Sequence, residues 1–245
     1  METKIMMRAA TTTAPRIGIG YGYCEQTLRE MVEKDPTFQA TNMGVFVDHH
    51  IVPSVPEGTY VHVTPPIELA DATHGGIRLT LNLVRALKWI AETGEPGCVF
   101  EDDVILARDW YKRVEALVRV VSGKCDKWMI TLHHLYRLED FDRVDATGFG
   151  EDLLMKWKYP TAFYANHGLC MPAAVASQFA MTISEKMLLP VYGGALDWYA
   201  DMGINRACAL HKIPIFNAHP CMCKHIGEVS AYGHRAPPAS PYFKG

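Results

Sequence analysis

The sequence predicts an α/β fold in which a mostly parallel sheet has helices on both faces. Short apolar runs of strand length alternate, through the first half of the chain, with segments whose apolar residues recur at helical spacing. This alternation is typical of a parallel sheet covered by helices. The apolar runs repeatedly end in Asp, Glu or His. Because ligands of open α/β sheets bind beyond the carboxyl ends of the strands, we expect the functional edge there.

The composition excludes several classes of protein. Of the 245 residues, 49% are hydrophobic and 21% are charged, which is ordinary for a globular chain. The net charge of −3 argues against a protein that holds nucleic acid mainly by bulk electrostatics, although it is compatible with a local basic groove. No apolar run reaches the roughly 18–20 residues that span a bilayer. Seven scattered cysteines are typical of free thiols in a reducing compartment, so we expect a cytoplasmic protein.

The chain divides into one domain and two short ends. Residues 1–15 are interpreted as a flexible N-terminal tail, because they hold scattered basic residues and a Thr-Thr-Thr-Ala-Pro run without the apolar core of a signal peptide. Residues 16–235 are interpreted as a single domain, and residues 236–245 as a C-terminal tail.

The first elements are short strands followed by a helix. Residues 16–23 alternate Ile and Gly and predict the first strand, since their glycines lack the G-x-G-x-x-G spacing of a dinucleotide site. Residues 43–47 and 60–63 predict the next two strands. A helix with one apolar face follows over residues 79–90, and Arg78 and Arg85 share another of its faces. Solvated charge is the ordinary interpretation of these arginines, and a phosphate or base contact is the alternative.

The next strand ends in three consecutive acids, Glu101, Asp102 and Asp103. Adjacent carboxylates repel one another, and burying them without a partner costs several kcal/mol. We therefore interpret this stretch as a strand end that supplies oxygen ligands to a cation. Mg²⁺ and Mn²⁺ bind carboxylate oxygens and keep positions open for phosphate. A solvated acidic turn is the alternative.

Beyond a second amphipathic helix at residues 110–121, the pattern is less regular. Strands are predicted at residues 128–132, 164–171 and 213–217, and the charged, aperiodic residues 139–158 predict a long loop or insertion. Within that segment, Lys-Trp-Lys-Tyr at positions 156–159 combines basic and aromatic side chains in a way that suits base stacking and phosphate binding. An ordinary surface loop is the alternative.

Two later segments carry further candidate residues. A helix that opens near Leu196 places Asp197 and Asp201 four residues apart on one face, where a carboxylate suits a general base. An N-cap is the alternative for Asp197. His225 begins a His-Ile-Gly-Glu loop, and a histidine from so far along the chain can complete a metal site begun by carboxylates. A surface imidazole is the alternative.

The order of these motifs resembles the GT-A class of nucleotide-sugar glycosyltransferases. The chain has an apolar strand, Glu-Asp-Asp, an amphipathic helix, Gly-Leu-Cys-Met-Pro from Gly168, Asp-Trp at Asp197, and then Pro-x-x-x-x-His-Ile-Gly-x-x-Ser over residues 220–230. The likeness covers roughly residues 16–230 by motif order. It implies a GT-A-like, Rossmann-type mixed sheet in a single catalytic domain.

The resemblance also implies roles for individual residues. Asp103 would bind a divalent Mn²⁺ or Mg²⁺ ion that holds the diphosphate of a nucleotide-sugar donor, with Glu101 and Asp102 beside the sugar and ribose. Asp48, which follows residues 43–47, would contact the nucleoside. His225 would reach the metal or the pyrophosphate.

For the reaction, the resemblance implies a metal-dependent glycosyltransferase that moves a sugar to an acceptor hydroxyl. Asp197 matches the base that deprotonates the acceptor, and Asp201 competes with it for that role. If the anomeric configuration is retained, neither acid needs to act as a base. The sequence leaves the acceptor open, with a bacterial or viral glycan and a hydroxylated nucleobase in DNA as two options.

Two other classes of function remain open. A metal-dependent nucleotidyltransferase or phosphohydrolase would use the same acids with further histidine ligands, namely His49, His50, His133 and His134. The absence of a P-loop or an H-x-x-x-H array argues against it. A non-catalytic module that binds a sugar nucleotide would keep the acidic strand end but would not need Asp197.

Overall fold

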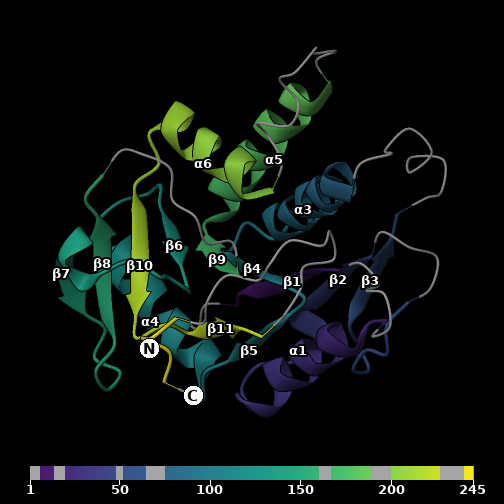
Figure 1. Cartoon of the computed structure of the whole chain (residues 1–245), viewed down its shortest axis with the longest axis horizontal. Coiled ribbons are helices and arrows are strands. Elements are labelled where there is room, and N and C mark those ends of the chain that lie inside the picture. The colour runs from purple at the N-terminus through teal and green to yellow at the C-terminus, as the bar shows by residue number, and fades with distance from the viewer. Residues whose placement is uncertain are drawn as a thin grey trace.

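The computed structural model of the protein describes residues 6–13, 20–47, 52–64, 75–159, 167–188, 200–226 and 240–244 (Figure 1). Within these residues, nine strands form one large sheet, two further strands form a small antiparallel ladder, and helices cover both faces of the large sheet. The α/β class predicted from the sequence is confirmed.

The large sheet has the strand order β3-β2-β1-β4-β9-β6-β10-β8-β7. Neighbours from β3 to β4 pair in parallel, as do β6 and β10, whereas β9 and β8 run against their neighbours. Among the described strands, seven of the nine in this sheet therefore run in one direction. The bounds are β1 (Arg8–Thr13), β2 (Met43–Val47), β3 (Tyr60–Val63), β4 (Gly97–Glu101), β6 (Met129–Thr131), β7 (Phe141–Ala146), β8 (Leu153–Trp157), β9 (Gly168–Met171) and β10 (Ile215–His219), with β5 (Val104–Leu106) and β11 (Cys223–His225) in the small ladder.

Helices pack on the two faces of the sheet and enclose two apolar cores. Two helices, α1 (Gly22–Glu33) and α4 (Trp110–Ser122), cover one face, where Leu28 and Leu117 are fully buried. Three helices cover the other face, with Leu87 in its core: α3 (Gly75–Ala91), α5 (Ala173–Leu188) and α6 (Ala200–His211). Two 3₁₀ turns complete the elements, η1 (Ala40–Asn42) and η2 (Leu138–Asp140). No helix among the described residues is long and apolar enough to cross a membrane.

The first strand differs from the prediction. It is β1, at Arg8–Thr13, which lies between β2 and β4 in the sheet and is buried except at Arg8. The expectation of a flexible tail is therefore wrong for these residues. The Thr-Thr-Thr run is polar, but β-branched threonines suit a strand, and the structure uses their hydroxyls in the interior. Of the expected strand at residues 16–23, residues 16–19 lie outside the described part, and α1 already begins at Gly22.

The segment expected to be a loop, residues 139–158, contains two antiparallel strands, β7 and β8. They form one edge of the sheet, and β8 pairs with β10. Most of β7 is exposed, which is why its sequence is charged and lacks an apolar periodicity. An edge strand with charged side chains avoids pairing with other molecules.

The C-terminal residues 240–244 also differ from the expected tail, because they pack against the strand ends. The buried Ser240 hydroxyl donates a hydrogen bond to the His134 carbonyl oxygen at 2.6 Å. The Cys221 amide donates to the Tyr242 carbonyl oxygen at 3.1 Å, and the Tyr242 ring stacks on His134 with 5.0 Å between centroids. These residues are therefore packed against the rest of the domain.

Candidate metal centre at the end of β4

The three acids that end β4 point toward three different elements. Thr13 at the end of β1 donates its hydroxyl proton to Asp102 Oδ2 at 2.6 Å. His167, which precedes β9, contacts Glu101, and His225 at the end of β11 contacts Asp103. The repulsion expected between adjacent carboxylates is relieved because each has its own partner.

Helix α1 holds the turn that carries these acids. The Thr27 hydroxyl lies 2.7 Å from the Val104 carbonyl oxygen and accepts a hydrogen bond from the Val104 amide at 3.2 Å. The same hydroxyl lies 3.1 Å from the Asp102 carbonyl oxygen. On the other side of the turn, the Ile226 amide donates to the Asp103 carbonyl oxygen at 2.8 Å. The backbone of the acidic turn is thus fixed from two directions.

The small ladder brings His225 to Asp103. Strand β5 begins directly after the acidic turn and pairs antiparallel with β11, so that Val104 lies opposite His225. His225 Nε2 lies 2.8 Å from Asp103 Oδ2, and both side chains are buried. The structure thus brings together two residues that are 122 positions apart, and their shared role in metal binding stays a prediction.

A second carboxylate–imidazole pair involves a residue that the sequence analysis missed. His167 Nδ1 lies 2.5 Å from Glu101 Oε2, and the His167 ring lies 4.5 Å from the His225 ring between centroids. Gly168 allows the start of β9 to lie close to β11, since a Cβ at this position would lie 2.8 Å from Cys223 Sγ. The signal in the sequence is a histidine directly before an apolar strand. Because β9 runs antiparallel to β4, its first residue lies at the same edge as the last residue of β4.

The ligand atoms of Glu101, His167 and His225 all lie within 4.8 Å of one another. Metal–ligand bonds of about 2.0–2.2 Å place two ligands of one ion up to about 4.4 Å apart, so a small adjustment would bring this group onto one cation. Asp103 adds a carboxylate beside His225. The donor set therefore fits a divalent metal ion, and its two imidazoles suit a transition metal better than Mg²⁺.

A third histidine, His133, lies behind the group. Its Nδ1 is 3.1 Å from the Cys223 carbonyl oxygen, which accepts the Nδ1 proton, and its ring meets the His167 ring edge-on at 4.8 Å. Burial, and next the neighbouring His167, lower the pKa of His133 to about 3. His133 is therefore a neutral imidazole with a fixed tautomer, which supports the position of β11 and adds no positive charge to the metal group.

Of the other histidines proposed as metal ligands, His134 lies outside this group. His134 is buried between Tyr242, Phe141 and His219, on a different side from His133. Burial, and then the nearby His219, lower the pKa of His134 to about 4. His49 and His50 lie outside the described residues.

The arginines predicted to bind the donor lie on α3. Arg85 Nη1 donates to Thr64 Oγ1 at 2.6 Å, and Thr64 follows β3. Arg85 is therefore at the same edge as the acids but three strands from β4, a separation of about 14 Å at the usual strand spacing. Burial lowers the pKa of Arg85. For Arg78, the structure describes the backbone in α3 and not the side chain.

Three of the predicted acids are not placed as side chains. Asp48 and Asp197 lie outside the described residues, and Asp201 is described only as backbone in the first turn of α6. Their assigned roles remain predictions.

No protein-family model and no curated protein matches this sequence. Among solved structures, the chain is similar to an active-site mutant of LgtC, with 10% identity and a TM-score of 0.47 over 86% of this chain and 72% of that one. It is also similar to a protein of Thermus thermophilus described as mannose-1-phosphate geranyltransferase, with 12% identity and a TM-score of 0.47 over 87% and 73% of the two chains. A third similar structure is a Bacillus anthracis protein assigned as a glucose-1-phosphate thymidylyltransferase, with 10% identity and a TM-score of 0.49 over 86% and 85%. At these TM-scores, nothing about chemistry follows for this chain.

Proposed function

We propose that this protein is a metal-dependent glycosyltransferase that moves a sugar from a nucleotide-sugar donor to an acceptor hydroxyl. The observation that carries the proposal is the pair of carboxylate–imidazole contacts, Glu101–His167 and Asp103–His225, at the carboxyl end of a central strand. That edge is where open α/β sheets bind their ligands.

In this proposal, Asp103 and His225 hold the divalent ion, with Glu101 and His167 completing the set. The ion, when bound, neutralises the negative charge that develops on the leaving diphosphate. Asp102 is fixed by the Thr13 hydroxyl and faces the sugar and ribose of the donor. The presence of two imidazoles favours Mn²⁺ over Mg²⁺.

The acceptor side of the proposal rests on Asp197 and Asp201. A carboxylate in the first turn of α6 suits the deprotonation of an acceptor hydroxyl in an inverting transfer. A glycan hydroxyl and a hydroxylated nucleobase in DNA are the two acceptor classes that we propose to test.

A nucleotidyltransferase is the second candidate function, because the same acids and histidines also suit an ion that bridges a nucleoside triphosphate and a sugar phosphate. The products distinguish the two reactions. A nucleotidyltransferase releases pyrophosphate from a nucleoside triphosphate, whereas a glycosyltransferase releases a nucleoside phosphate from a nucleotide-sugar.

The experiment that tests the proposal is a thermal-shift and calorimetric screen of UDP-, GDP-, dTDP- and CMP-sugars with Mn²⁺, Mg²⁺ or EDTA. A ligand that binds only the folded state at 100 times its Kd stabilises it by about 2.7 kcal/mol. We expect one nucleotide-sugar to stabilise the protein, more strongly with Mn²⁺ than with Mg²⁺, and EDTA to abolish the effect.

Asp103→Asn provides the matching variant, with the exposed Asp142→Asn as its control. The first should lose metal-dependent stabilisation by the donor, and the second should retain it. Equal stabilisation of both variants, or stabilisation of the native protein by nucleoside triphosphates alone, would refute the glycosyltransferase assignment.

A further inference from the structure

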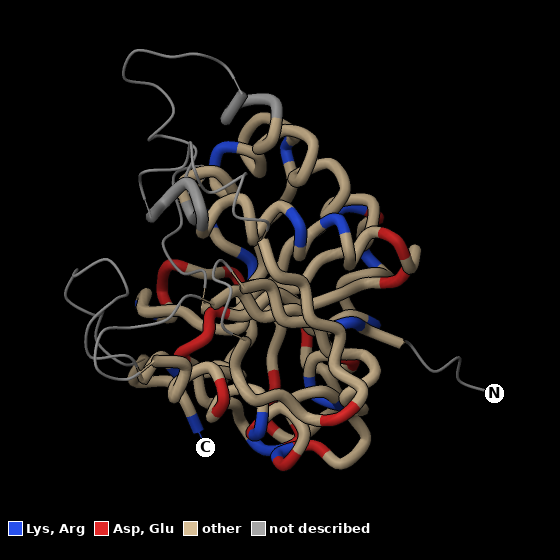
Figure 2. Tube along the Cα trace, turned by 90° about the vertical axis from the view of Figure 1, so that its right-hand side faces the viewer, with Lys and Arg blue, Asp and Glu red and all other residues tan. Residues whose placement is uncertain are grey.

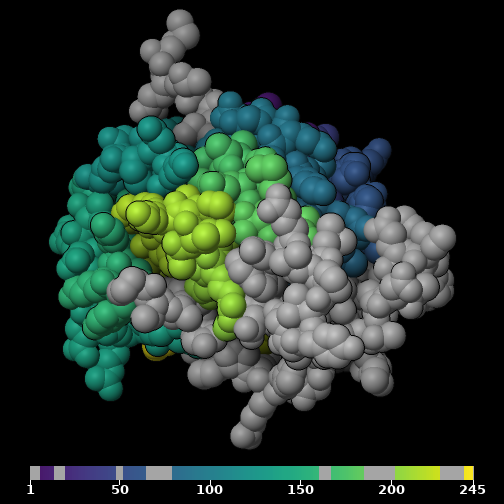
Figure 3. All heavy atoms as spheres, turned by 90° about the horizontal axis from the view of Figure 1, so that it is seen from above, coloured from purple at the N-terminus to yellow at the C-terminus, as the bar shows by residue number. Residues whose placement is uncertain are grey.

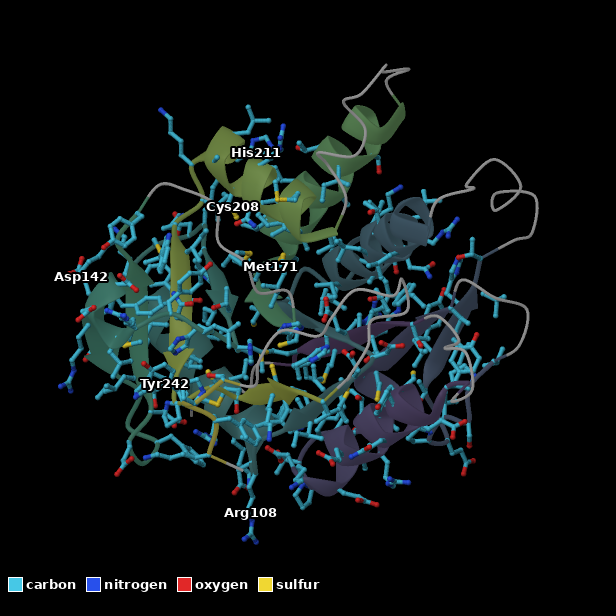
Figure 4. The ribbon with its side chains drawn as sticks, viewed as in Figure 1. Arg108, Asp142, Met171, Cys208, His211 and Tyr242 are labelled. Carbon is cyan, nitrogen blue, oxygen red and sulfur yellow. The ribbon has the colours of Figure 1, made fainter. Side chains whose placement is uncertain are left out.

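A cavity of about 620 Å³ lies away from the metal centre, between α6, the start of β10 and the end of β8. Figure 3 shows α6 beside the strands of this edge, and Figure 4 shows Cys208, which lines the cavity, on α6 near β10. Ligand pockets in proteins typically have volumes of about 300–1,000 Å³. The cavity is therefore large enough for a nucleotide.

The cavity lies at the amino-terminal ends of the parallel strands, whereas the metal centre lies at their carboxyl ends. Its lining includes Ile213 and Ile215, where β10 begins, and β10 runs parallel to β6. The carboxyl end of β10, at His219, belongs to the other edge. Five strand residues at about 3.3 Å each separate the two edges by roughly 16 Å, so the cavity is distinct from the site at the end of β4.

Every charged side chain that lines the cavity within the described residues is a cation. Arg206 comes from α6 and Lys212 from the turn after it, whereas the Lys156 side chain, opposite Phe216 of β10, is on the α4 face of the sheet. Over the described part of the chain as a whole, Figure 2 shows Lys and Arg interspersed with Asp and Glu. A concave surface with one sign of charge concentrates ligands of the opposite sign, so the occupant is an anion.

Two aromatic rings indicate the rest of the occupant. Trp157 and Tyr159 both line the cavity, with 5.2 Å between ring centroids and a T-shaped arrangement. The Tyr159 side chain is held by a hydrogen bond from its hydroxyl to Asp140 at 3.3 Å, and the residue is nevertheless 49% exposed. An exposed aromatic face beside cations is the arrangement with which proteins stack bases and bind the adjoining phosphates.

We propose that this cavity binds a nucleotide unit, with the base on Tyr159 or Trp157 and the phosphate between Arg206 and Lys212. The unit belongs either to a free nucleotide or to a single-stranded nucleic acid, since both present a planar base and a phosphate. Binding is independent of the metal centre, so it does not rest on the function proposed above.

Lys212 can be replaced by glycine without straining the backbone. Its φ of 53° is in the left-handed region that favours glycine, and its amide donates to the Ala209 carbonyl oxygen at the end of α6. Lys212→Gly therefore removes the cation while suiting the backbone. Arg206→Gln removes the second cation and keeps a polar side chain.

The test measures binding of a short fluorescein-labelled oligothymidylate by fluorescence anisotropy, in EDTA so that a metal-dependent site is silent. We expect saturable binding that weakens at least about tenfold when Arg206→Gln and Lys212→Gly are combined. The slope of log K against log salt should fall by about 0.7 for each lost phosphate contact. Arg137→Gln, at an exposed arginine outside the cavity, is the control and should bind as the native protein does.

The stacking part of the proposal has its own variants. Tyr159→Leu should weaken binding about tenfold, in line with the effect of removing one stacked base, whereas Tyr159→Phe should keep the affinity. If thymidine monophosphate competes fully with the oligomer, the ligand is a free nucleotide. If it does not compete, the ligand is the single-stranded polymer. The proposal would be overturned if the charge variants bound with the affinity of the native protein, or if neither nucleotide ligand bound. It would also be overturned if inorganic phosphate competed as strongly as the nucleotide.

Discussion

At the scale of single residues, His134 shows how burial sets a charge state. It is fully buried beside Tyr242 and Phe141, and its pKa is lowered to about 4, first by burial and then by His219. An unfolded histidine has a pKa of about 6.5. Between these two pKa values the unfolded chain binds the proton that the folded chain excludes.

The stability of the protein should therefore fall as the pH decreases from about 6.5 to about 4. The contribution of His134 is fully present above pH 6.5, and its loss amounts to about 1.4 kcal/mol per pH unit within the window. His134→Phe preserves the ring contacts and removes the titration. In urea unfolding at several pH values, the free energy of unfolding of this variant should change across the window by about 3 kcal/mol less than that of the native protein. An unchanged pH dependence would show that His134 is protonated in the folded state.

At the scale of elements, the sequence predicts best those segments whose apolar pattern matches their burial. Four elements lie where the apolar pattern predicts them: the strands β2 and β3 and the helices α3 and α4. Strand β1 was missed because its threonines are polar but buried inside the sheet. Strand β7 was missed because an exposed edge strand need not alternate apolar and polar residues, and β8 was missed with it because it belongs to the same charged segment.

The residue directly before β8, Asp152, is joined to α4 by an ion pair that the sequence pattern does not reveal. Arg113 donates from Nε and Nη2 to the two carboxylate oxygens of Asp152, at 2.7 and 2.6 Å. Both side chains are nearly inaccessible, 11% and 4% exposed. Removing one partner of such a pair leaves a buried charge without compensation.

We expect Asp152→Ala to destabilise the protein by about 3–5 kcal/mol in chemical unfolding. The matched control is Asp145→Ala, which removes an exposed partner of Lys124 and should leave the unfolding midpoint unchanged. Combining Arg113→Met with Asp152→Leu should recover much of the lost stability, because neither charge then remains buried. A loss for Asp152→Ala as small as that of the control would mean that water reaches Arg113.

At the scale of the whole molecule, the site assembles from parts that are distant in the sequence. The acids at the end of β4 were singled out by a local pattern, an apolar strand that ends in carboxylates, and His225 by the resemblance in motif order; their role as metal ligands stays a prediction. His167 could not be found by the same reasoning, because its place depends on β9 running antiparallel to β4. The direction of a strand is a tertiary property, which the apolar pattern of the strand itself does not contain.

We propose that the end of β4, the start of β9 and the end of β11 form one divalent metal site. The most direct test is a titration of the protein with Mn²⁺, in which electron paramagnetic resonance measures the free ion. We predict one saturable Mn²⁺ site per chain that is lost in Asp103→Asn and in His225→Gln and is retained in Asp142→Asn. Absence of saturable binding, or the same affinity in all of these variants, would contradict the claim.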